Sequence, residues 1–522
     1  MDFKNSCTLV PPPSASLNKS FKAIFFLIIS ILTFSFFSCD GGLFGSSDGI
    51  IIRAYDADSW QDTGILYANR GRSVFRTPND SENENHTYKI TLSQGLYEHT
   101  KTVGGGTIVV MDNIPVGPWK ITCRAYKSDG TLEYMGSTDA EVIENKTVTA
   151  SIELRKCPVV TFMDGVTVIA SQAIEFGGRM TKPENPKNKG FSFVGWYKDS
   201  NSVGTGTEFD FGTEINEDIT LYARWEYDMV DVINSSVTVT GADPSFVPSD
   251  ANSEAKGVFK TGQKTLNPYS MGRYEVTQEL YKMIMDGETV NGEALASDPS
   301  YCKETGDFPL VNGEIQNKRP VDNVTWYDAV YFCNVLTEKT LGADKKVYTI
   351  SDITIESSHI TSATVEMDMA KTGYRLPKEA EWEFAARGGN TSEPDWNYMF
   401  SGHEGEAGKA YNEDKNSGLD SVGWYTYNTA NGVTGNSEPT IGTAGYGTHE
   451  IGKKKHNRLG IYDMNGNVWE WCYDLQSTDR RIRRGGSWSS PARNSTVSMR
   501  VNYWPEYHKN DFGIRLVRSI GD

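Results

Sequence analysis

The sequence predicts a multi-domain protein in which two β-rich modules precede a C-terminal α+β domain. Its 522 residues are enough for about three domains with buried cores. Residues 50–155 alternate apolar and polar side chains with a period of two, which is the pattern of half-buried strands. Capped helical patterns begin only after Gly257. Strand-rich units are therefore expected first and a mixed unit last.

Composition narrows the classes of partner. The hydrophobic content of 38%, with 50 Gly and 26 Tyr residues, indicates a globular, loop-rich chain. The formal net charge of -17 argues against nucleic-acid binding, which needs a basic face. The basic runs Lys453–Lys455 and Arg480–Arg484 are predicted to be charged loop and strand edges. No nucleic-acid partner is expected.

The N-terminus predicts export. Residues 1–38 are interpreted as a signal peptide, because two lysines precede the apolar run Ala23–Phe37, which is too short for a comfortable membrane span. Ser38-Cys39 resembles a lipobox, so Cys39 is predicted to carry a lipid anchor, and residues 39–49 form a flexible tether. The chain is expected to be anchored to the cell envelope, at the outer membrane or cell surface. Plain secretion is the alternative.

The remaining cysteines show no spacing of a zinc site or a disulfide framework. They are expected to be mostly buried free thiols. These residues are Cys123, Cys157, Cys302, Cys333 and Cys472.

Residues 50–155 are predicted to form a β-sandwich-like module. Ile121, Cys123 and Ala125 alternate with polar neighbours, and Asp129-Gly130 then provides a hairpin-type turn. Val148–Leu154 alternates in the same way. This module is expected to act as a spacer.

Residues 157–226 form a second unit with its own motifs. Gly190-x-x-Phe-x-Gly-Trp-Tyr197 and the ending Asp218-Ile-Thr-Leu-Tyr-Ala-x-Trp225 resemble the Listeria–Bacteroides repeat of bacterial surface proteins. The resemblance implies a compact β-grasp-like module that serves as a stalk or adhesion element. Four side chains can supply its small core. They are Phe193, Trp196, Leu221 and Trp225.

Residues 227–256 lack helical periodicity and are predicted to be a linker, so that the third domain spans 257–522. Thr277 can cap one helix in this domain. Thr325 and Asp328 form a capping-box pair for a second helix, which Gly342 can end. A third helix is predicted to start at Pro377.

Five motifs of this domain resemble, in order and spacing, the formylglycine-generating enzyme (sulfatase-modifying factor) family. They are Arg319–Val321, Val324–Ala329, Gly373–Gly389, Gly460–Trp471 and Gly513–Val517. The resemblance implies a C-type-lectin-like α+β fold. Enzymes of that family carry two copper-binding cysteines on the loop that follows the Gly485-Gly486-Ser487 motif.

Counting from Gly485-Gly486-Ser487, those two cysteine slots fall on Ser490 and Ser495. A hydroxyl near its ordinary pKa is neither a soft copper ligand nor a redox group. The sequence therefore predicts no catalytic residues here, and copper is not expected as a cofactor.

The loop from Asp463 to Glu470 offers oxygen ligands of the kind that calcium prefers. The family resemblance implies a Ca²⁺ ion held by the side chains of Asp463 and Glu470 and by the carbonyls of Gly466 and Val468. The alternative is a calcium-free hydrogen-bonded turn.

The end of the chain is rich in residue types that build adaptable binding surfaces, where rigid aromatic rings anchor and small polar groups form hydrogen bonds. This segment also resembles the variable region of retroelement-diversified receptors. The alternative is an ordinary polar surface loop. The candidate ligand-binding residues are Trp488, Ser489, Ser490, Arg493, Asn494, Ser495, Asn502, Tyr503, Trp504, Tyr507, His508 and Asn510.

These observations predict an envelope-anchored lipoprotein that binds a protein or glycan ligand through its C-terminal segment, with the membrane as a second partner through the lipid anchor. A formylglycine-generating oxidase or another protein-modifying enzyme is one alternative, although the enzyme needs thiols that the loop lacks. A structural envelope scaffold is the other.

Overall fold

The computed structural model describes most of the chain from Ile50 to Ile520. The described residues are 50–56, 73–76, 86–105, 108–111, 114–143, 148–200, 203, 206–240, 247, 254–260, 263–406, 413–430 and 439–520. The predicted signal peptide, Cys39 and the tether lie outside them. The chain forms two compact units, of which one includes residues 90–122 and 137–153 and the other includes residues 154–520. No helix among the described residues is long and apolar enough to cross a membrane.

The N-terminal residues form strands, as the alternation predicted. Their order in the sheet is β4-β3-β6-β7-β8-β1-β2-β5. Ile121, Cys123 and Ala125 of β6 are buried, while their neighbours are exposed or half-buried. The single strand order does not divide the strands into two layers, so the sandwich stays a prediction. The strands are β1 (Ile50–Asp56), β2 (Ser73–Arg76), β3 (Thr87–Gln94), β4 (Tyr97–Gly104), β5 (Ile108–Met111), β6 (Gly117–Tyr126), β7 (Leu132–Val142) and β8 (Val148–Lys156).

The second module is a four-stranded mixed sheet in the order β10-β9-β12-β11. It consists of β9 (Val159–Asp164), β10 (Thr167–Ala173), β11 (Phe191–Tyr197) and β12 (Ile219–Tyr227), with β9 and β12 parallel. Trp196, Leu221 and Trp225 are buried, and the half-buried Phe193 packs edge-on against both tryptophans. The predicted aromatic core is confirmed. The described residues of this module contain no helix, so the β-grasp assignment stays a prediction.

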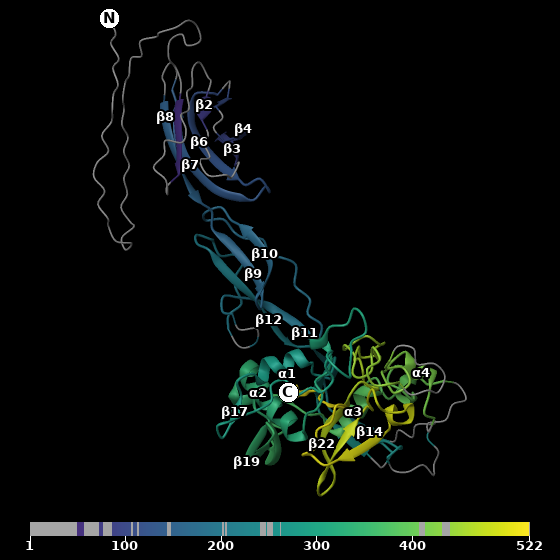
Figure 1. Ribbon diagram of the computed structural model, residues 1–522. Coiled ribbons are helices and arrows are strands. Elements are labelled where there is room, and N and C mark those ends of the chain that lie inside the picture. The colour runs from purple at the N-terminus through teal and green to yellow at the C-terminus, as the bar shows by residue number, and fades with distance from the viewer. Residues whose placement is uncertain are drawn as a thin grey trace, which may run out of the picture. The chain divides into compact units, whose positions relative to one another are not determined.

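The C-terminal domain combines two four-stranded sheets, three two-stranded hairpins and short helices (Figure 1). The sheets have the orders β13-β16-β26-β21 and β24-β23-β22-β25. Their strands are β13 (Met229–Ile233), β16 (Tyr269–Gly272), β21 (Tyr374–Arg375), β22 (Trp469–Ser477), β23 (Arg480–Arg484), β24 (Arg500–Tyr503), β25 (Phe512–Gly513) and β26 (Val517–Ser519). The hairpins are β14 (Val237–Thr240) with β15 (Gln263–Leu266), β17 (Thr289–Val290) with β18 (Glu293–Ala294), and β19 (Tyr348–Glu356) with β20 (His359–Met367).

The helices are α1 (Gln278–Met285), α2 (Trp326–Leu341), α3 (Glu379–Ala386) and α4 (Ser417–Asp420), with 3-10 turns η1 (Gln316–Lys318), η2 (Ala343–Lys345), η3 (Pro394–Asn397) and η4 (Ala492–Ser495). Thr277 caps α1, and Thr325 with Asp328 forms the capping box of α2, which ends at Gly342 with a positive φ of 102°. These three predictions are confirmed.

The predicted start of the third helix is wrong by two residues. The helix begins at Glu379 with Lys378 as its N-cap. The carbonyl oxygen of Pro377 accepts a hydrogen bond from the Tyr473 backbone N–H at 2.9 Å, which ties Pro377 to β22 before the helix can begin.

The linker prediction for residues 227–256 is also corrected. Met229–Ile233 forms β13, which pairs with β16 inside a sheet of the C-terminal domain, and Val237–Thr240 forms β14. The domain therefore starts near residue 228 and not at Gly257. Residues 241–246 and 248–253 lie outside the described part of the chain.

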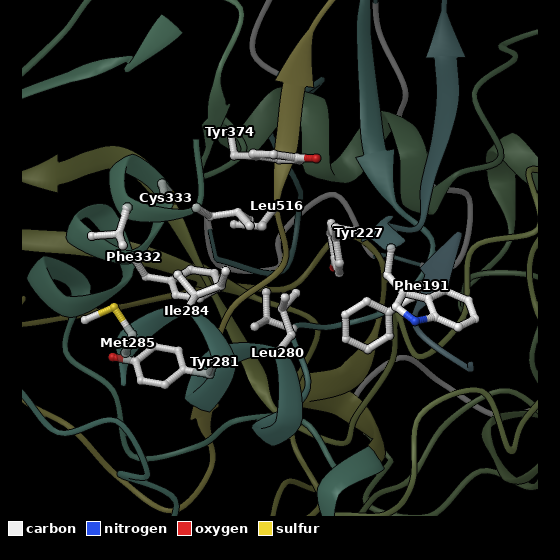
Figure 2. Close-up of a cluster of buried hydrophobic side chains, with 14 of the residues drawn as sticks. Phe191, Tyr227, Leu280, Tyr281, Ile284, Met285, Phe332, Cys333, Tyr374 and Leu516 are labelled. Carbon is white, nitrogen blue, oxygen red and sulfur yellow. The ribbon is translucent and has the colours of Figure 1, made fainter. Parts of the chain in front are cut away.

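One hydrophobic cluster joins the second module to the C-terminal domain within the larger unit. Phe191 of β11 and Tyr227 of β12 belong to the same buried cluster as Leu280 of α1 (Figure 2). α1 and α2 lie side by side and contribute most of the other labelled side chains. Burial of this cluster fixes one end of the repeat-like sheet against the domain.

Candidate functional site

The loop that holds the two serine slots begins with a glycine pair after β23. Gly485 and Gly486 both have positive φ, at 95° and 80°. A Cβ on Gly486 would lie 2.2 Å from the Ser495 hydroxyl oxygen, so only glycine lets the chain pass there. The turn brings the first residues of the loop against the second slot.

Both slots are buried in hydrogen-bonded loop structure. Ser490 is 5% exposed, and its hydroxyl lies 2.9 Å from that of Ser487, which donates to Asp511 Oδ2 at 2.9 Å. Ser495 is fully buried, and its hydroxyl has no hydrogen-bond partner. Its carbonyl accepts from the side-chain amide of Asn465 at 2.6 Å. The pair offers two neutral hydroxyls where the family resemblance implies thiols.

The thiols of the described residues are buried, free and in other places, as predicted. Burial raises the pKa of Cys302 and of Cys472 well above its ordinary value, which disfavours the thiolate. Cys302 packs in one cluster with Trp488 of the loop, and the Cys302 thiol and the Trp488 indole N–H both donate to the Asn510 carbonyl, at 3.3 and 3.0 Å. These thiols have the environment of packing residues.

The predicted calcium loop is buried and acidic. Asp463 and Asn467 adopt positive φ, at 56° and 60°. Asp463 Oδ2 accepts from the Gly452 N–H at 2.6 Å, whereas its Oδ1 is buried without a partner. Glu470 accepts from Arg515 Nε at 2.9 and 3.0 Å and from the Trp382 indole. Burial raises the pKa of Asp463 to about 6, because the charged form loses water.

A third buried carboxylate, Glu275, lies beside this loop and was not found from the sequence. Its oxygens accept from the Asn467 side chain at 2.7 Å and from the Val468 N–H at 3.2 Å. Burial first, and then the charges of Asp463 and Glu470, raise its pKa well above the usual range. No local sequence pattern connects Glu275 to the loop, because it precedes Asp463 by nearly two hundred residues.

The residues of this loop fit a hard cation. Of the three buried carboxylates, Glu470 forms an ion pair with Arg515, whereas one carboxylate oxygen of Asp463 lacks any partner. Ca²⁺ takes oxygen ligands and would supply the missing positive charge. Among the described residues no three His, Cys, Asp or Glu side chains converge as a ligand group, so backbone carbonyls such as those of Gly466 and Val468 would have to complete the coordination.

The candidate ligand-binding residues divide into a buried and an accessible group. Trp488, at 3% exposed, packs with Phe308 and Tyr446, and Ser490 and Ser495 are buried as well. Arg493 forms an ion pair with Asp414. The accessible group consists of the exposed or half-buried residues Ser489, Arg493, Asn494, Asn502, Tyr503, Trp504, Tyr507, His508 and Asn510.

Three of the accessible residues form an aromatic triad, defined as Tyr503, Trp504 and Tyr507. Their ring centres lie 5.4 to 5.6 Å apart in edge-on and tilted arrangements. Tyr503 also packs against Phe512 at 5.3 Å, which fixes the triad to β25. Tyr507 is 47% exposed. The structure thus brings three predicted residues together at the end of β24.

His508 lies next to the triad and stacks on His359 with ring centres 4.1 Å apart. His359 Nδ1 is 2.7 Å from Asp328 Oδ2, and His508 Nδ1 is 2.8 Å from the Asn323 side-chain oxygen. Burial, followed by the nearby His359, lowers the pKa of His508. The histidine pair ties the end of the chain to the N-terminus of α2.

Two cavities of about 200 and 160 Å³ open elsewhere on the domain. The larger is lined by residues of β15, α3 and β22, including Lys264, Lys378 and Asp474. The smaller lies beside α1 and η1. Neither is lined by a candidate site residue.

Two regions of the chain match known protein families. Residues 228–520 match the model of the sulfatase-modifying factor enzyme 1-like domain, and residues 159–224 match the Listeria–Bacteroides repeat domain. Both resemblances inferred from the motifs are confirmed.

Individual relatives match about half of the chain. The chain is 32% identical over 298 residues to a protein named chaperone protein LppX of Paenibacillus barcinonensis, covering 55% of this chain and 92% of that protein. It is 25% identical over 290 residues to inactive C-alpha-formylglycine-generating enzyme 2 of Mus musculus, covering 52% and 82%. Among solved structures, Treponema denticola variable protein 1 is 28% identical with a TM-score of 0.37, covering 55% and 95%.

Proposed function

Because the chain belongs to the sulfatase-modifying factor family through residues 228–520, we propose that it uses this fold to bind a macromolecular ligand and not to oxidise cysteine. The observation that carries the proposal is the donor set of the loop. Ser490 and Ser495 present buried hydroxyls, and Ser495 has no hydrogen-bond partner at all. Soft metal chemistry needs thiolate donors at such positions. The name of the mouse relative, which is called inactive, agrees with this proposal.

The ligand-binding surface is the accessible group around the aromatic triad. Tyr and Trp supply rigid contact area with little loss of conformational freedom, and the neighbouring Asn and Ser side chains supply hydrogen bonds. Trp488, Ser490 and Ser495 are buried and contribute little to the accessible surface. A protein or a glycan fits this composition. The relative named as a chaperone protein favours a protein.

Bound calcium would also stabilise the start of the loop that carries Ser490 and Ser495. The side chains of Asp463 and Glu470, with the carbonyls of Gly466 and Val468, would hold the ion. Asn467 of the same loop accepts a hydrogen bond from Trp488 N–H through its carbonyl at 2.9 Å. An ion that orders this loop therefore orders the start of the serine-bearing loop as well.

Anchoring to the cell envelope through Cys39 completes the proposal. The lipobox-like sequence Ser38-Cys39 supports it. A Cys39→Ser variant should move from the membrane fraction to the soluble fraction of the cell envelope. Retention of the variant in the membrane fraction would refute lipid anchoring at this residue.

The central test is a binding screen of the full chain against glycan and protein arrays, repeated with Tyr503, Trp504 and Tyr507 all changed to alanine. Loss of about tenfold or more in affinity is expected for this variant, because such side chains dominate binding energy. The matched control changes the exposed aromatic residues Tyr97, Phe176 and Tyr301 to alanine and should bind normally. Equal binding by both variants would contradict the proposal.

The enzymatic alternative has its own test. Copper(I) loading and oxidation of a sulfatase-type cysteine peptide are measured for the native chain and for a Ser490→Cys, Ser495→Cys variant. The native chain should do neither, whereas the double variant should bind copper(I), since two thiols replace the hydroxyls. Stoichiometric copper and peptide oxidation by the native chain would overturn the non-catalytic assignment.

A further inference from the structure

Positive charge without acidic partners gathers around the aromatic triad. The chain has a net charge of -17, yet Arg480, Arg483 and Lys509, which stack on rings of the triad, form no ion pair among the described residues. Other arginines of the same strands differ, since Arg484 pairs with Glu383 and Arg500 pairs with Glu379. Three cations without an ion pair therefore lie beside the triad.

Aromatic rings hold two of these cations in place. The guanidinium of Arg480 lies 4.2 Å from the ring centre of Trp504, and its Nη1 donates to the Asn502 side-chain oxygen at 3.3 Å. The ammonium of Lys509 lies 4.7 Å from the ring centre of Tyr503. A cation–π contact positions a cation without neutralising it, so both charges stay available to an anion.

Arg483 adds a buried charge beneath the triad. It is 5% exposed and stacks 3.8 Å from the ring centre of Phe512 and 4.8 Å from that of Tyr503. Its Nε and Nη1 have no hydrogen-bond partner. Burial lowers the pKa of Arg483 to about 10, so the group stays protonated at neutral pH. The charge of Asp511 acts on Arg483 without forming an ion pair, so the buried guanidinium is only partly compensated.

The acidic residues of the same segment form no ion pair with Arg480 or Lys509 among the described residues. Asp511 accepts hydrogen bonds from Ser487 and Ser489, at 2.9 and 3.2 Å, and its charge acts on Arg483. Glu506 is the other acid between Arg500 and Asp511. The overall negative charge of the chain is screened beyond roughly 8 Å at physiological salt, so contacts at the triad follow the local cations.

We propose that the aromatic triad, with Arg480 and Lys509 at its rim and Arg483 beneath it, binds an acidic segment of a polypeptide partner. This inference rests on the proposed function and names its ligand class. Tyr, Trp and Arg are the residues that dominate protein–protein hot spots. A neutral sugar normally stacks on an open ring face, whereas Arg480 and Lys509 already occupy faces of Trp504 and Tyr503. Carboxylates of a partner can pair with the cations while its apolar groups meet the ring edges.

The test uses labelled synthetic peptides that are identical except that glutamate is replaced by glutamine or by lysine, with the full chain as receptor. Fluorescence anisotropy should show binding of the glutamate peptide and at least about tenfold weaker binding of the other two. A variant with Arg480→Gln and Lys509→Gln should lose the glutamate peptide by a similar factor. The matched control, Arg179→Gln with Lys187→Gln, removes the same charge from exposed positions of the repeat and should bind normally.

A second pair of probes separates the sources of negative charge. Polygalacturonate and its fully methyl-esterified, neutral form share one backbone and differ in their carboxylates. Binding of polygalacturonate without binding of the glutamate peptide would overturn the polypeptide assignment in favour of an acidic glycan. Absence of binding to both acidic probes would overturn the inference outright.

Failure of the acidic-ligand inference can be told apart from failure of the proposed binding function. If the array screen finds a neutral or basic ligand whose capture needs Tyr503, Trp504 and Tyr507, the binding function stands and the acidic class is wrong. If the triple alanine variant and the Arg480 and Lys509 variant both lose the glutamate peptide, the same surface carries function and ligand class together. Unchanged thermal unfolding of each variant excludes a loss caused by misfolding.

Discussion

The Ser490 and Ser495 hydroxyls differ in how the protein accommodates them. Ser490 joins a chain of hydroxyls that ends on the Asp511 carboxylate, so its oxygen is used for structure. Ser495 is buried with no partner for its oxygen, which ordinarily costs about 1 to 3 kcal/mol. A position that is kept polar at such a cost, without the thiol chemistry, fits a loop whose shape matters more than its reactivity.

Removing the buried charge of Asp463 should stabilise the calcium-free protein at neutral pH. Its pKa is raised by burial to about 6, above the unfolded value near 4, so ionisation penalises the folded state above pH 6 and the penalty fades as pH falls toward 4. Asp463→Asn keeps an acceptor for the Gly452 N–H. Urea unfolding in a calcium chelator should show a gain of about 1 to 3 kcal/mol at pH 8 and little gain at pH 4.

Unfolding with added Ca²⁺ is the second condition in which this variant and the native chain are compared. Added Ca²⁺ should stabilise the native chain at pH 8 and leave Asp463→Asn nearly unchanged, because the ion needs the ionised ligand. The inference of a calcium loop is rejected if saturating Ca²⁺ leaves the unfolding midpoint of the native chain where the chelator put it.

The sequence was sufficient to find the serine slots and insufficient to find what surrounds them. The Gly485-Gly486-Ser487 motif fixed the counting, and both of its glycines have positive φ. Trp488 was predicted to contact ligand, but its neighbours Phe308 and Tyr446 come from segments that no local pattern connects to it. Arg483 was interpreted as part of a charged edge for the same reason, since its burial depends on Phe512.

Local chemistry also decided how well the helices could be predicted. The ends of α2 were found because its capping box and its terminal glycine are short-range signals. The start of α3 was missed, since the Pro377 carbonyl is held by Tyr473, almost a hundred residues away. β13 was mistaken for linker because it is a short strand whose partner β16 is needed to define it.

The capping box of α2 carries a measurable share of stability. Thr325 Oγ1 accepts from the Asp328 N–H at 2.9 Å and donates to the Ile360 carbonyl at 2.8 Å, while the Thr325 N–H reaches the Asp328 carboxylate at 3.1 Å. Thr325→Ala removes the first two bonds and should cost about 2 kcal/mol, the upper end for an N-cap. Urea unfolding gives the value, with Thr349→Ala on the exposed side of β19 as control. A loss no larger than that of the control would show that the cap is dispensable.

The order of modules along the chain was predictable from the sequence. The sequence did not show that the second module and the C-terminal domain share one core. The second module was expected to be a separate stalk, yet its last strand leads directly into β13. Tyr227 donates to the Tyr274 carbonyl, Arg273 Nε donates to Asp228 Oδ2 at 2.9 Å, and Lys189 pairs with Glu450 at 2.9 Å. Together with the shared cluster of Figure 2, these contacts make the junction part of one core.

A shared core predicts shared unfolding. Phe191, which is 7% exposed, packs in the cluster with Leu280 of α1, and Lys318 lies 5.2 Å from its ring centre. Hydrogen exchange followed through a urea series should show peptides of the repeat and of the C-terminal domain opening together in the native chain. Phe191→Ala should cost about 3 to 5 kcal/mol and let the repeat open first, because the junction loses its largest apolar contact.

The exposed Phe176 of the same module supplies the control, and its change to alanine should shift stability by no more than about 0.5 kcal/mol. Separate opening of the repeat in the native chain would mean that the buried junction transmits no cooperativity. In that event the module would act as an independent stalk after all. Joint opening would instead mean that a force or a ligand acting on the C-terminal domain also changes the stability of the repeat. The reason is that the two regions unfold only together.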